Sequence, residues 1–261
     1  MKYRLHLSFL LAIILTAWYA IPSSGQSNPS AHHLRPDCRT AGHSPYRGTH
    51  NFGKSIAVFG GSLSVNDESD AAKQMWADLL DAEITTYGAG GAGFSLEQGY
   101  SIQHQVDTAG LHDIYILWAS TNDFTNCRDV GTWKDYTAYD GYDESRLASQ
   151  CGGINYCIRK ILEKNPEATI FFFTSLRFFS SESGHNPFSE QANGAGFTFA
   201  DYIEGQKACC ANYGIPVLDQ FSQQGINEVN FEKYYMEDHL HMNREGYLRI
   251  APAQVSFIAS H

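Results

Sequence analysis

The sequence predicts an α/β fold in three layers, in which a mostly parallel sheet of five strands lies between two layers of helices. Short runs of β-favouring residues recur along the chain, and the longest are apolar at nearly every position rather than at alternate positions. Segments with apolar residues at helical spacing separate these runs. Strands that are apolar throughout are buried on both faces, and the intervening helices cover them in a parallel α/β arrangement.

Five strands are expected from the composition and length of the apolar runs. The first, SIAVF, stops at two glycines, and the third and fourth, DIYILW and TIFFFT, are the most continuously apolar. The second and fifth are shorter runs that fall between helical segments. In chain order the strands are predicted over Ser55–Phe59, Ile84–Tyr87, Asp113–Trp118, Thr169–Thr174 and Ile215–Leu218.

Five helices are expected between and after these strands. The first carries Met75, Leu79 and Leu80 at helical spacing. The third has its apolar residues on one face, and the fourth is followed by Gly214, a residue type that commonly ends helices in the left-handed conformation. In chain order the helices are predicted over Ala71–Leu80, Ser95–Val106, Gly153–Lys164, Phe199–Tyr213 and, despite Pro252, Arg244–Ser260.

The chain divides into three parts by composition. Residues 1–25 have a positive start, an apolar core and a small, polar end, and this pattern is typical of a cleaved secretory signal rather than a membrane anchor. Residues 26–51 are polar and rich in His, Pro and Ser, so we expect a leader that packs on the surface. Residues 52–261 suit one α/β domain, and we predict a secreted or periplasmic protein.

The charge balance argues against two classes of partner. Without residues 1–25 the chain has 16 basic and 28 acidic residues, a formal net charge of −12. Such a protein is repelled by phosphate backbones and anionic membrane surfaces. We therefore expect no nucleic-acid partner and no stable membrane insertion, whereas the oligomeric state stays open.

All six cysteines lie after the expected signal, where disulfides are permitted. Six cysteines allow 15 pairings, and a bond between Cys127 and Cys151 is favoured because it would staple the loop between them. The cysteine spacings match no zinc motif, and we expect no metal or other cofactor. The six residues are Cys38, Cys127, Cys151, Cys157, Cys209 and Cys210.

Ser62 is the first candidate for chemistry. It follows the first strand and two glycines, at the end of a strand where open α/β sheets place their ligands and reactive groups. A serine at this place can also be the N-cap of the next helix. The nucleophile interpretation needs a base and an acid from elsewhere in the chain.

The stretch DHLH at residues 238–241 supplies both groups. An Asp three residues before a His can bring a carboxylate and an imidazole to one turn, so Asp238 and His241 are the favoured pair. His239 is a competing base with a less suitable spacing. A metal site made of these three residues has few further ligands in the sequence, and we do not expect one.

Four motifs follow one another in chain order. They are GGSLS at 60–64, GAGGAGFS at 88–95, STND at 120–123 and DHLH at 238–241. Together they resemble the SGNH hydrolase superfamily, also called GDSL esterases and lipases, from about residue 55 to the end. The resemblance implies a flavodoxin-like sandwich for residues 52–261.

The resemblance also implies roles for individual residues. Ser62 would be the nucleophile, His241 the base and Asp238 the acid that orients it. The oxyanion hole would use the Ser62 and Gly93 backbone N–H groups and the Asn122 amide, with Gly90 as a rival to Gly93. Three positions depart from the family pattern: Gly61 stands for Asp, Ser120 for Gly, and Gly88 for Asn.

Two long segments, 124–150 and 175–198, follow strand ends and are expected to overhang the site. Phe124, Arg177 and Phe178 are weak candidates for substrate contacts, and for Arg177 a structural salt bridge is the competing interpretation. Other aromatic residues of these segments could stack on sugar rings or line an acyl site; they are Trp133, Tyr136, Tyr139 and Phe179.

The predicted function is a secreted serine esterase that removes acetyl groups from carbohydrate. Its partner would be a glycan or small-molecule ester. The first alternative is a lipid or short-chain acyl esterase, which a preference for long acyl chains would reveal. The second is a glycan-binding protein without catalysis, which a serine-directed fluorophosphonate would fail to label.

Overall fold

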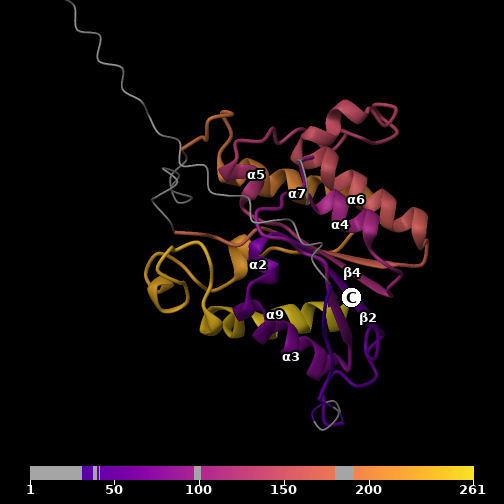
Figure 1. Ribbon diagram of the computed structural model, residues 1–261, viewed down its shortest axis with the longest axis vertical. Coiled ribbons are helices and arrows are strands. Elements are labelled where there is room, and N and C mark those ends of the chain that lie inside the picture. The colour runs from indigo at the N-terminus through magenta and orange to yellow at the C-terminus, as the bar shows by residue number, and fades with distance from the viewer. Residues whose placement is uncertain (1–30, 38–39, 41, 97–100, 180–190) are drawn as a thin grey trace, which may run out of the picture.

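The computed structural model describes residues 31–37, 40, 42–96, 101–179 and 191–261, and these form a central sheet with helices on both faces (Figure 1). The sheet has six strands in the order β1-β3-β2-β4-β5-β6. All neighbouring pairs are parallel except β1 with β3. The strands are β1 (His32–Leu34), β2 (Ser55–Gly60), β3 (Glu83–Thr86), β4 (Ile114–Trp118), β5 (Thr169–Phe173) and β6 (Val217–Leu218).

The helices form two layers, with α3 and α9 on one face of the sheet and α4, α6 and α7 on the other (Figure 1). Short helices occupy the connections after several strands. The α-helices are α2 (Ser62–Val65), α3 (Asp70–Leu80), α4 (Ile102–Thr108), α5 (Asn122–Thr125), α6 (Gln150–Lys164), α7 (Phe199–Tyr213), α8 (Gln220–Gln223) and α9 (Arg244–Ser260). The described residues also form the 3-10 helices η1 (Asp67–Ser69), η2 (Glu144–Ala148) and η3 (Phe231–Lys233).

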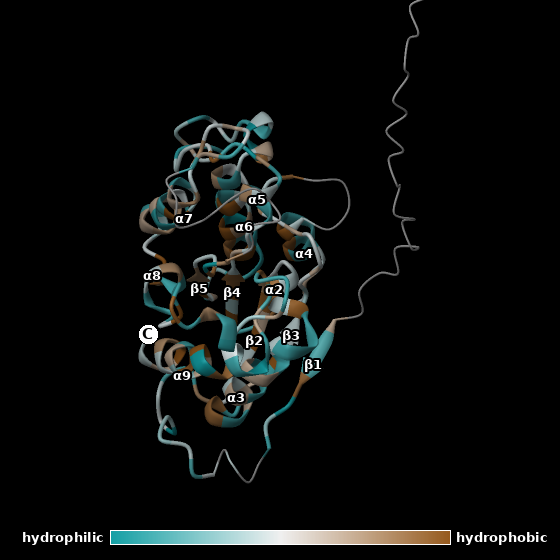
Figure 2. Cartoon of the chain, turned by 90° about the vertical axis from the view of Figure 1, so that its left-hand side faces the viewer, coloured by the Kyte–Doolittle hydropathy of each residue, from teal (hydrophilic) through white to brown (hydrophobic). Residues whose placement is uncertain are grey.

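The strands separate two hydrophobic cores because side chains alternate across the sheet. In β2, Ile56 and Val58 face α3 and α9, whereas Ala57 and Phe59 face the other layer. Figure 2 shows hydrophobic stretches on the helices that flank the sheet, among them α3, α4, α6 and α9. This two-sided burial is what the continuously apolar runs predicted.

The three-layer, mostly parallel fold is confirmed, with one more strand than the five expected. The additional strand β1 comes from the leader, which pairs antiparallel with β3 from His32 to Leu34. Without it β3 would be an open edge with unpaired backbone groups, so the leader covers that edge. The polar composition of the leader gave no sign of this pairing.

The helix expected over Ser95–Val106 is wrong at its start. The observed helix α4 begins at Ile102, after the N-cap Ser101. Ser95 is held outside any helix, since its backbone N–H and its hydroxyl both donate to the Asp123 carboxylate, at 3.0 and 2.6 Å. A contact across 28 residues in sequence is invisible to local periodicity.

The predicted Cys127–Cys151 disulfide is wrong, because both residues have free thiols. The Cys127 sulfur packs against Gly194, whereas the Cys151 sulfur packs against Gly205 of α7. Among the described residues, Cys157, Cys209 and Cys210 are also free. Cys38 and the expected signal lie outside the described residues, and so does His185. No helix in the described part of the chain has the length and apolar character to span a membrane.

Candidate active site

Ser62 lies where β2 ends and α2 begins. A Cβ on Gly60 would come within 2.6 Å of the Trp118 carbonyl and 2.7 Å of the Ser64 hydroxyl, so the turn needs a glycine there. The N-cap interpretation of Ser62 is wrong, because the cap residue of α2 is Gly61. The Ser62 hydroxyl is instead directed at an imidazole.

The terminal motif brings an imidazole and a carboxylate to this serine. His241 Nε2 lies 2.8 Å from Ser62 Oγ, and His241 Nδ1 lies 2.6 Å from Asp238 Oδ2. The other Asp238 oxygen accepts the backbone N–H groups of Leu240 and His241, both at 2.9 Å. The structure thus brings the three predicted triad residues together, and their catalytic roles remain predictions.

The local contacts of Asp238 keep its carboxyl group ionised. Partial burial raises the pKa of Asp238, but the hydrogen bonds from the His241 ring and from the two backbone N–H groups outweigh it. The net result is a pKa below the ordinary value. A carboxylate beside Nδ1 favours the tautomer that leaves Nε2 free to accept a proton from Ser62.

His239 does not take part in this cluster. Its backbone is in the left-handed region, with φ of 53°, and its ring packs edge-on against Phe231 at 5.1 Å between centroids. Its carbonyl accepts the Phe179 N–H at 2.7 Å. The geometry therefore favours His241 over His239 as the base.

Helix α9 ties the nucleophile turn to the terminal motif. The Tyr247 hydroxyl donates to the Leu63 carbonyl at 2.7 Å and accepts from the Asn66 amide at 3.1 Å. Tyr247 lies one turn into α9, which begins three residues after His241. The same helix thus fixes both the residue after Ser62 and the position from which His241 reaches it.

A buried lysine of α3 also contacts the turn that carries Ser62. The Lys73 side chain is 1% exposed, and its ammonium group donates to the Ser64 carbonyl at 2.8 Å and approaches Asp70 Oδ1 at 2.9 Å. Burial lowers the pKa of Lys73, and the hydrogen bond to Asp70 partly restores it. The local sequence gives no sign of this role for Lys73, because a lysine in an amphipathic helix usually faces solvent.

Gln105 of α4 fixes the last residue of β2. Its Oε1 accepts the Gly60 N–H at 2.9 Å, and its Nε2 donates to the Gly60 carbonyl at 3.0 Å. The side-chain amide thus pairs with Gly60 as a neighbouring strand would. Strand β3 pairs with β2 only as far as Val58, so it does not reach Gly60. Gln105 therefore bonds the backbone groups of Gly60 in its place.

The backbone N–H groups expected in the oxyanion hole are those of Ser62 and Gly93. Neither has an acceptor among the described residues. The Ala92 carbonyl, directly before Gly93, lies against the turn at Gly61, so the second motif reaches the nucleophile at this point. Gly90 has open space around it, so the packing favours Gly93 as the residue of the hole.

Asp123 holds the second motif in place. Its carboxylate is almost fully buried and accepts the Phe94 N–H at 2.8 Å in addition to both groups of Ser95. A Cβ on Gly93 would come within 2.4 Å of Asp123 Oδ1. Glycine at this position therefore lets the carboxylate approach the backbone closely.

We expect Gly93→Ala to impair the protein strongly, because the new methyl group must displace the Asp123 carboxylate from its three donors. The midpoint of thermal unfolding should fall, and ester turnover should fall by about 10²-fold or more, because the shifted backbone no longer holds the N–H of residue 93 at the expected oxyanion position. Gly90→Ala is the matched control, since its Cβ meets nothing within 4 Å. Equal losses in both variants would contradict the assignment.

The structure places Phe124 and Phe178, two of the candidate substrate contacts, in the core. Both are 1% exposed and pack with Phe199 in one aromatic cluster, with ring centroids 5.0 to 6.1 Å apart. Arg177 donates to the Phe221 carbonyl at 2.7 Å and stacks on its ring. The described contacts of all three candidates are packing contacts on the α7 side of the sheet. Long segments after strand ends contribute side chains to the hydrophobic core as well as to a cleft.

The aromatic residues of the first long segment pack on the outer helices. Tyr136 contacts Tyr156 of α6 at 5.5 Å between centroids, and the Arg159 guanidinium of α6 lies 3.9 Å from the Tyr142 ring centroid. Trp133 packs edge-on against the exposed Tyr139. These contacts attach the segment to α6, and none of them involves a residue of the triad.

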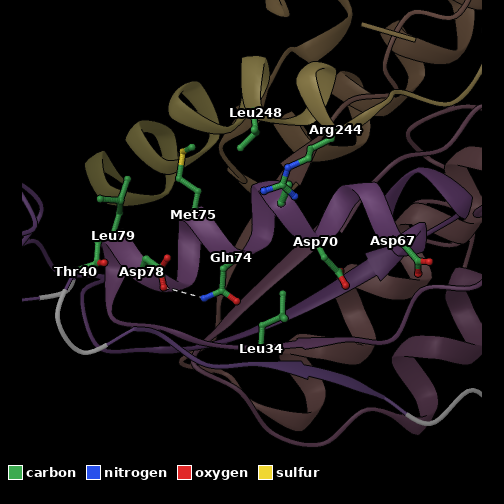
Figure 3. Close-up of a pocket in the computed structure, with 11 residues that line it drawn as sticks. Leu34, Thr40, Asp67, Asp70, Gln74, Met75, Asp78, Leu79, Arg244 and Leu248 are labelled. Carbon is green, nitrogen blue, oxygen red and sulfur yellow. Dashed lines mark hydrogen bonds between the residues drawn. The ribbon is translucent and has the colours of Figure 1, made fainter. Parts of the chain in front are cut away.

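A groove of about 590 Å³ crosses the outer surface of α3 (Figure 3). Figure 3 shows Leu34 of β1 on one side of α3 and the α9 residues Arg244 and Leu248 on the other. Gln74 and Asp78 of α3 are joined by a hydrogen bond of 2.8 Å. No residue of the triad lines this groove, so it is separate from the candidate site.

We expect Asp238→Asn to lower ester turnover by about 10³- to 10⁴-fold, because an amide no longer selects the required imidazole tautomer. Its effect on stability should be below about 1 kcal/mol, since 45% of the carboxylate side chain is exposed and solvent screens the pair. The folded-state pKa is lowered, so this contribution is present at neutral pH and is lost as pH falls below 3.8. Kinetics and urea unfolding at neutral pH check both expectations.

The fold and the site define a class: an α/β protein with a serine, histidine and aspartate cluster at the carboxyl end of its central strands. The chain belongs to the GDSL-like lipase/acylhydrolase family, whose model matches residues 52–249. The resemblance to the SGNH hydrolase superfamily is confirmed. Membership of this family supports an ester-hydrolysing enzyme.

Solved structures show the same fold at low identity. A protein from Lactobacillus plantarum is 20% identical with a TM-score of 0.65, and the match covers 81% of this chain and 99% of that one. A possible lipase from Chitinophaga pinensis is 20% identical with a TM-score of 0.59, covering 78% and 96%. The lipase/acylhydrolase from Enterococcus faecalis is 14% identical with a TM-score of 0.54, covering 79% and 95%. No curated protein matches the chain significantly.

Proposed function

We propose that the protein is a serine esterase that works through an acyl-enzyme. The observation that carries the proposal is the continuous chain from Ser62 Oγ to His241 Nε2 at 2.8 Å and from His241 Nδ1 to Asp238 at 2.6 Å. These distances lie within the range needed for proton transfer. The N–H groups of Ser62 and Gly93, which have no acceptor in the described part of the chain, supply donors beside the nucleophile.

In the first half of the reaction, Ser62 Oγ attacks the ester carbonyl while its proton passes to His241 Nε2. The tetrahedral oxyanion is held by N–H donors, and Asp238 stabilises the imidazolium. His241 then protonates the departing alcohol, which leaves the acyl group on Ser62. In the second half, water attacks this acyl group with His241 again as base, and the acid is released.

We propose acetylated carbohydrate as the substrate class. The described neighbours of Ser62 are small or polar: Gly61 precedes it, His241 contacts its hydroxyl, and Asn122 Nδ2 lies against Gly61. The candidate aromatic contacts Phe124 and Phe178 lie in the core. Such surroundings favour a short acyl group and a hydrophilic alcohol. A long acyl chain would need an extended apolar surface to leave water.

A panel of nitrophenyl esters from acetate to palmitate, run beside acetylated xylan and acetylated pectin, tests the substrate class. We expect kcat/KM to be highest for acetate and to fall steadily with chain length, and acetate release from at least one polymer. Ser62→Ala protein is the blank for each substrate. A maximum at eight or more carbons, with no release from polymer, would replace this proposal with a lipid esterase.

We also propose that the protein is exported, on the basis of the signal-like composition of residues 1–25. Expression of the full chain in a bacterial host should place the mature protein outside the cytoplasm. N-terminal sequencing of that fraction should show cleavage near Ser24 to Gln26. An intact N-terminus on protein confined to the cytoplasm would contradict export.

A further inference from the structure

Ser120 joins two parts of the candidate oxyanion hole through one hydroxyl group. The residue lies two positions after the last residue of β4 and is 3% exposed. Its hydroxyl donates to the Ala92 carbonyl at 2.7 Å and accepts both the backbone N–H and the side-chain Nδ2 of Asn122, each at 3.2 Å. Asn122 Nδ2 also donates to the Ala92 carbonyl at 2.9 Å.

This arrangement selects which end of the Asn122 amide faces the network. The Ala92 carbonyl can only accept, and the single hydroxyl hydrogen of Ser120 is already used on that carbonyl. Both partners therefore present lone pairs to Asn122. A reversed amide would place its Oδ1 against two acceptors, at the cost of an unsatisfied buried group.

The orientation matters because only the NH₂ end can stabilise an oxyanion. Nδ2 carries two hydrogens, and the shorter contact holds one of them on the Ala92 carbonyl. The second has only the longer contact of 3.2 Å to Ser120 Oγ, so the same N–H can be shared with an oxyanion that forms beside Ser62. A reversed amide would present Oδ1 and repel that charge.

Gly61 provides the space for this network next to the nucleophile. A Cβ on Gly61 would come within 2.7 Å of both the Ala92 carbonyl and the Ser120 Cβ, and within 2.8 Å of Asn122 Nδ2. The Ser120 side chain thus occupies the volume that any side chain at 61 would require. Gly61 and Ser120, which both depart from the family motifs, are thus complementary in volume: the first has no side chain where the second places its own.

We propose that Ser120 is a positioning residue that fixes the donor end of Asn122 at the oxyanion hole, with Gly61 as its steric counterpart. The inference rests on the proposed esterase function and adds a residue to it. Ser120 acts through Asn122 and touches neither the acyl carbon nor the leaving group.

A double-mutant cycle on kcat tests the proposal. Ser120→Ala removes the hydroxyl and keeps the Cβ, and we expect kcat on nitrophenyl acetate to fall about tenfold with KM within twofold of wild type. Asn122→Ala should cost about 10²-fold or more. In the Asn122→Ala background, Ser120→Ala should cost nothing further, because the group that it positions is gone. Full additivity would overturn the proposal.

A second pair of variants tests the shared volume. Gly61→Ala should lower both kcat and the midpoint of thermal unfolding. Adding Ser120→Gly should recover part of the lost thermal stability, because it removes the Ser120 Cβ that the new methyl group would meet at 2.7 Å, while kcat stays low because the positioning hydroxyl is gone. No recovery would show that the two positions are independent. Ser44→Ala is the control, since it also removes a buried hydroxyl that donates to a backbone carbonyl, at the distant leader. It should lower stability without changing kcat.

The outcomes separate this inference from the proposed function. If wild-type protein hydrolyses no ester and a fluorophosphonate fails to label it, the esterase proposal fails first. If wild-type protein is active and Ser120→Ala keeps full kcat, only the positioning role fails.

Discussion

Replacement of Ser62 by alanine is expected to reduce ester turnover by about 10⁴- to 10⁶-fold, the loss seen when a serine nucleophile is removed from a working triad. The hydroxyl makes its described contact with His241 alone, so little folding energy depends on it. We therefore expect the variant to unfold within a few degrees of wild type. Kinetics with nitrophenyl acetate and thermal unfolding by circular dichroism measure the two quantities.

A covalent probe makes the same test independent of substrate choice. A fluorophosphonate should label wild-type protein once per chain, and peptide mapping should place the adduct on Ser62. Ser62→Ala protein should remain unlabelled, while Ser64→Ala protein should still react at Ser62, since Ser64 is buried and donates to the Gly61 carbonyl. Labelling at another serine, or wild-type turnover in Ser62→Ala, would remove the basis of the proposed mechanism.

The sequence predicted those parts of the molecule that local pattern controls. Apolar runs such as Ile114–Trp118 are buried on both faces of the sheet, and burial on both faces is what makes a strand readable as a continuous hydrophobic segment. Helix α7 has the predicted bounds because a capping box begins it at Thr198 and Gly214 ends it in the left-handed conformation. These signals lie within a few residues of the feature that they specify.

The pattern failed where contacts distant in sequence decide the structure. Strand β1 depends on the exposed edge of β3, fifty residues later in the chain. The late start of α4 depends on the buried Asp123, and the burial of Phe124 and Phe178 depends on Phe199 of α7. No window of local sequence contains both partners of such contacts.

The candidate site shows the same division. Ser62 and Asn122 could be named because their motifs follow strands. Asp238 and His241 could be named because their spacing brings a carboxylate and an imidazole to one turn. Their supporting residues, Lys73 and Gln105, come from helices and have no motif of their own. In the sequence, Ser120 and Gly61 stand out only as departures from the family motifs. That the Ser120 side chain fills the space beside Gly61 is visible only in the structure.

The last expected result concerns the choice between two histidines. His241→Ala should lower turnover by at least about 10⁴-fold, because the base that accepts the Ser62 proton and the partner of Asp238 are lost together. His239→Ala should retain most of the activity. Its side chain faces Phe231, and its contribution to the site is a backbone carbonyl that alanine also supplies.

His239→Gly serves as a further control for the backbone. The left-handed conformation at φ of 53° is strained for most residues and free for glycine, so this variant should keep the turn and its activity. If His239→Gly and His239→Ala both lose turnover while His241→Ala keeps it, the base has been assigned to the wrong imidazole. His239 and His241 belong to one turn, so a change at either could also disturb the fold. Comparing the turnover of the three variants, after thermal unfolding has shown that they are equally stable, decides which imidazole is the base.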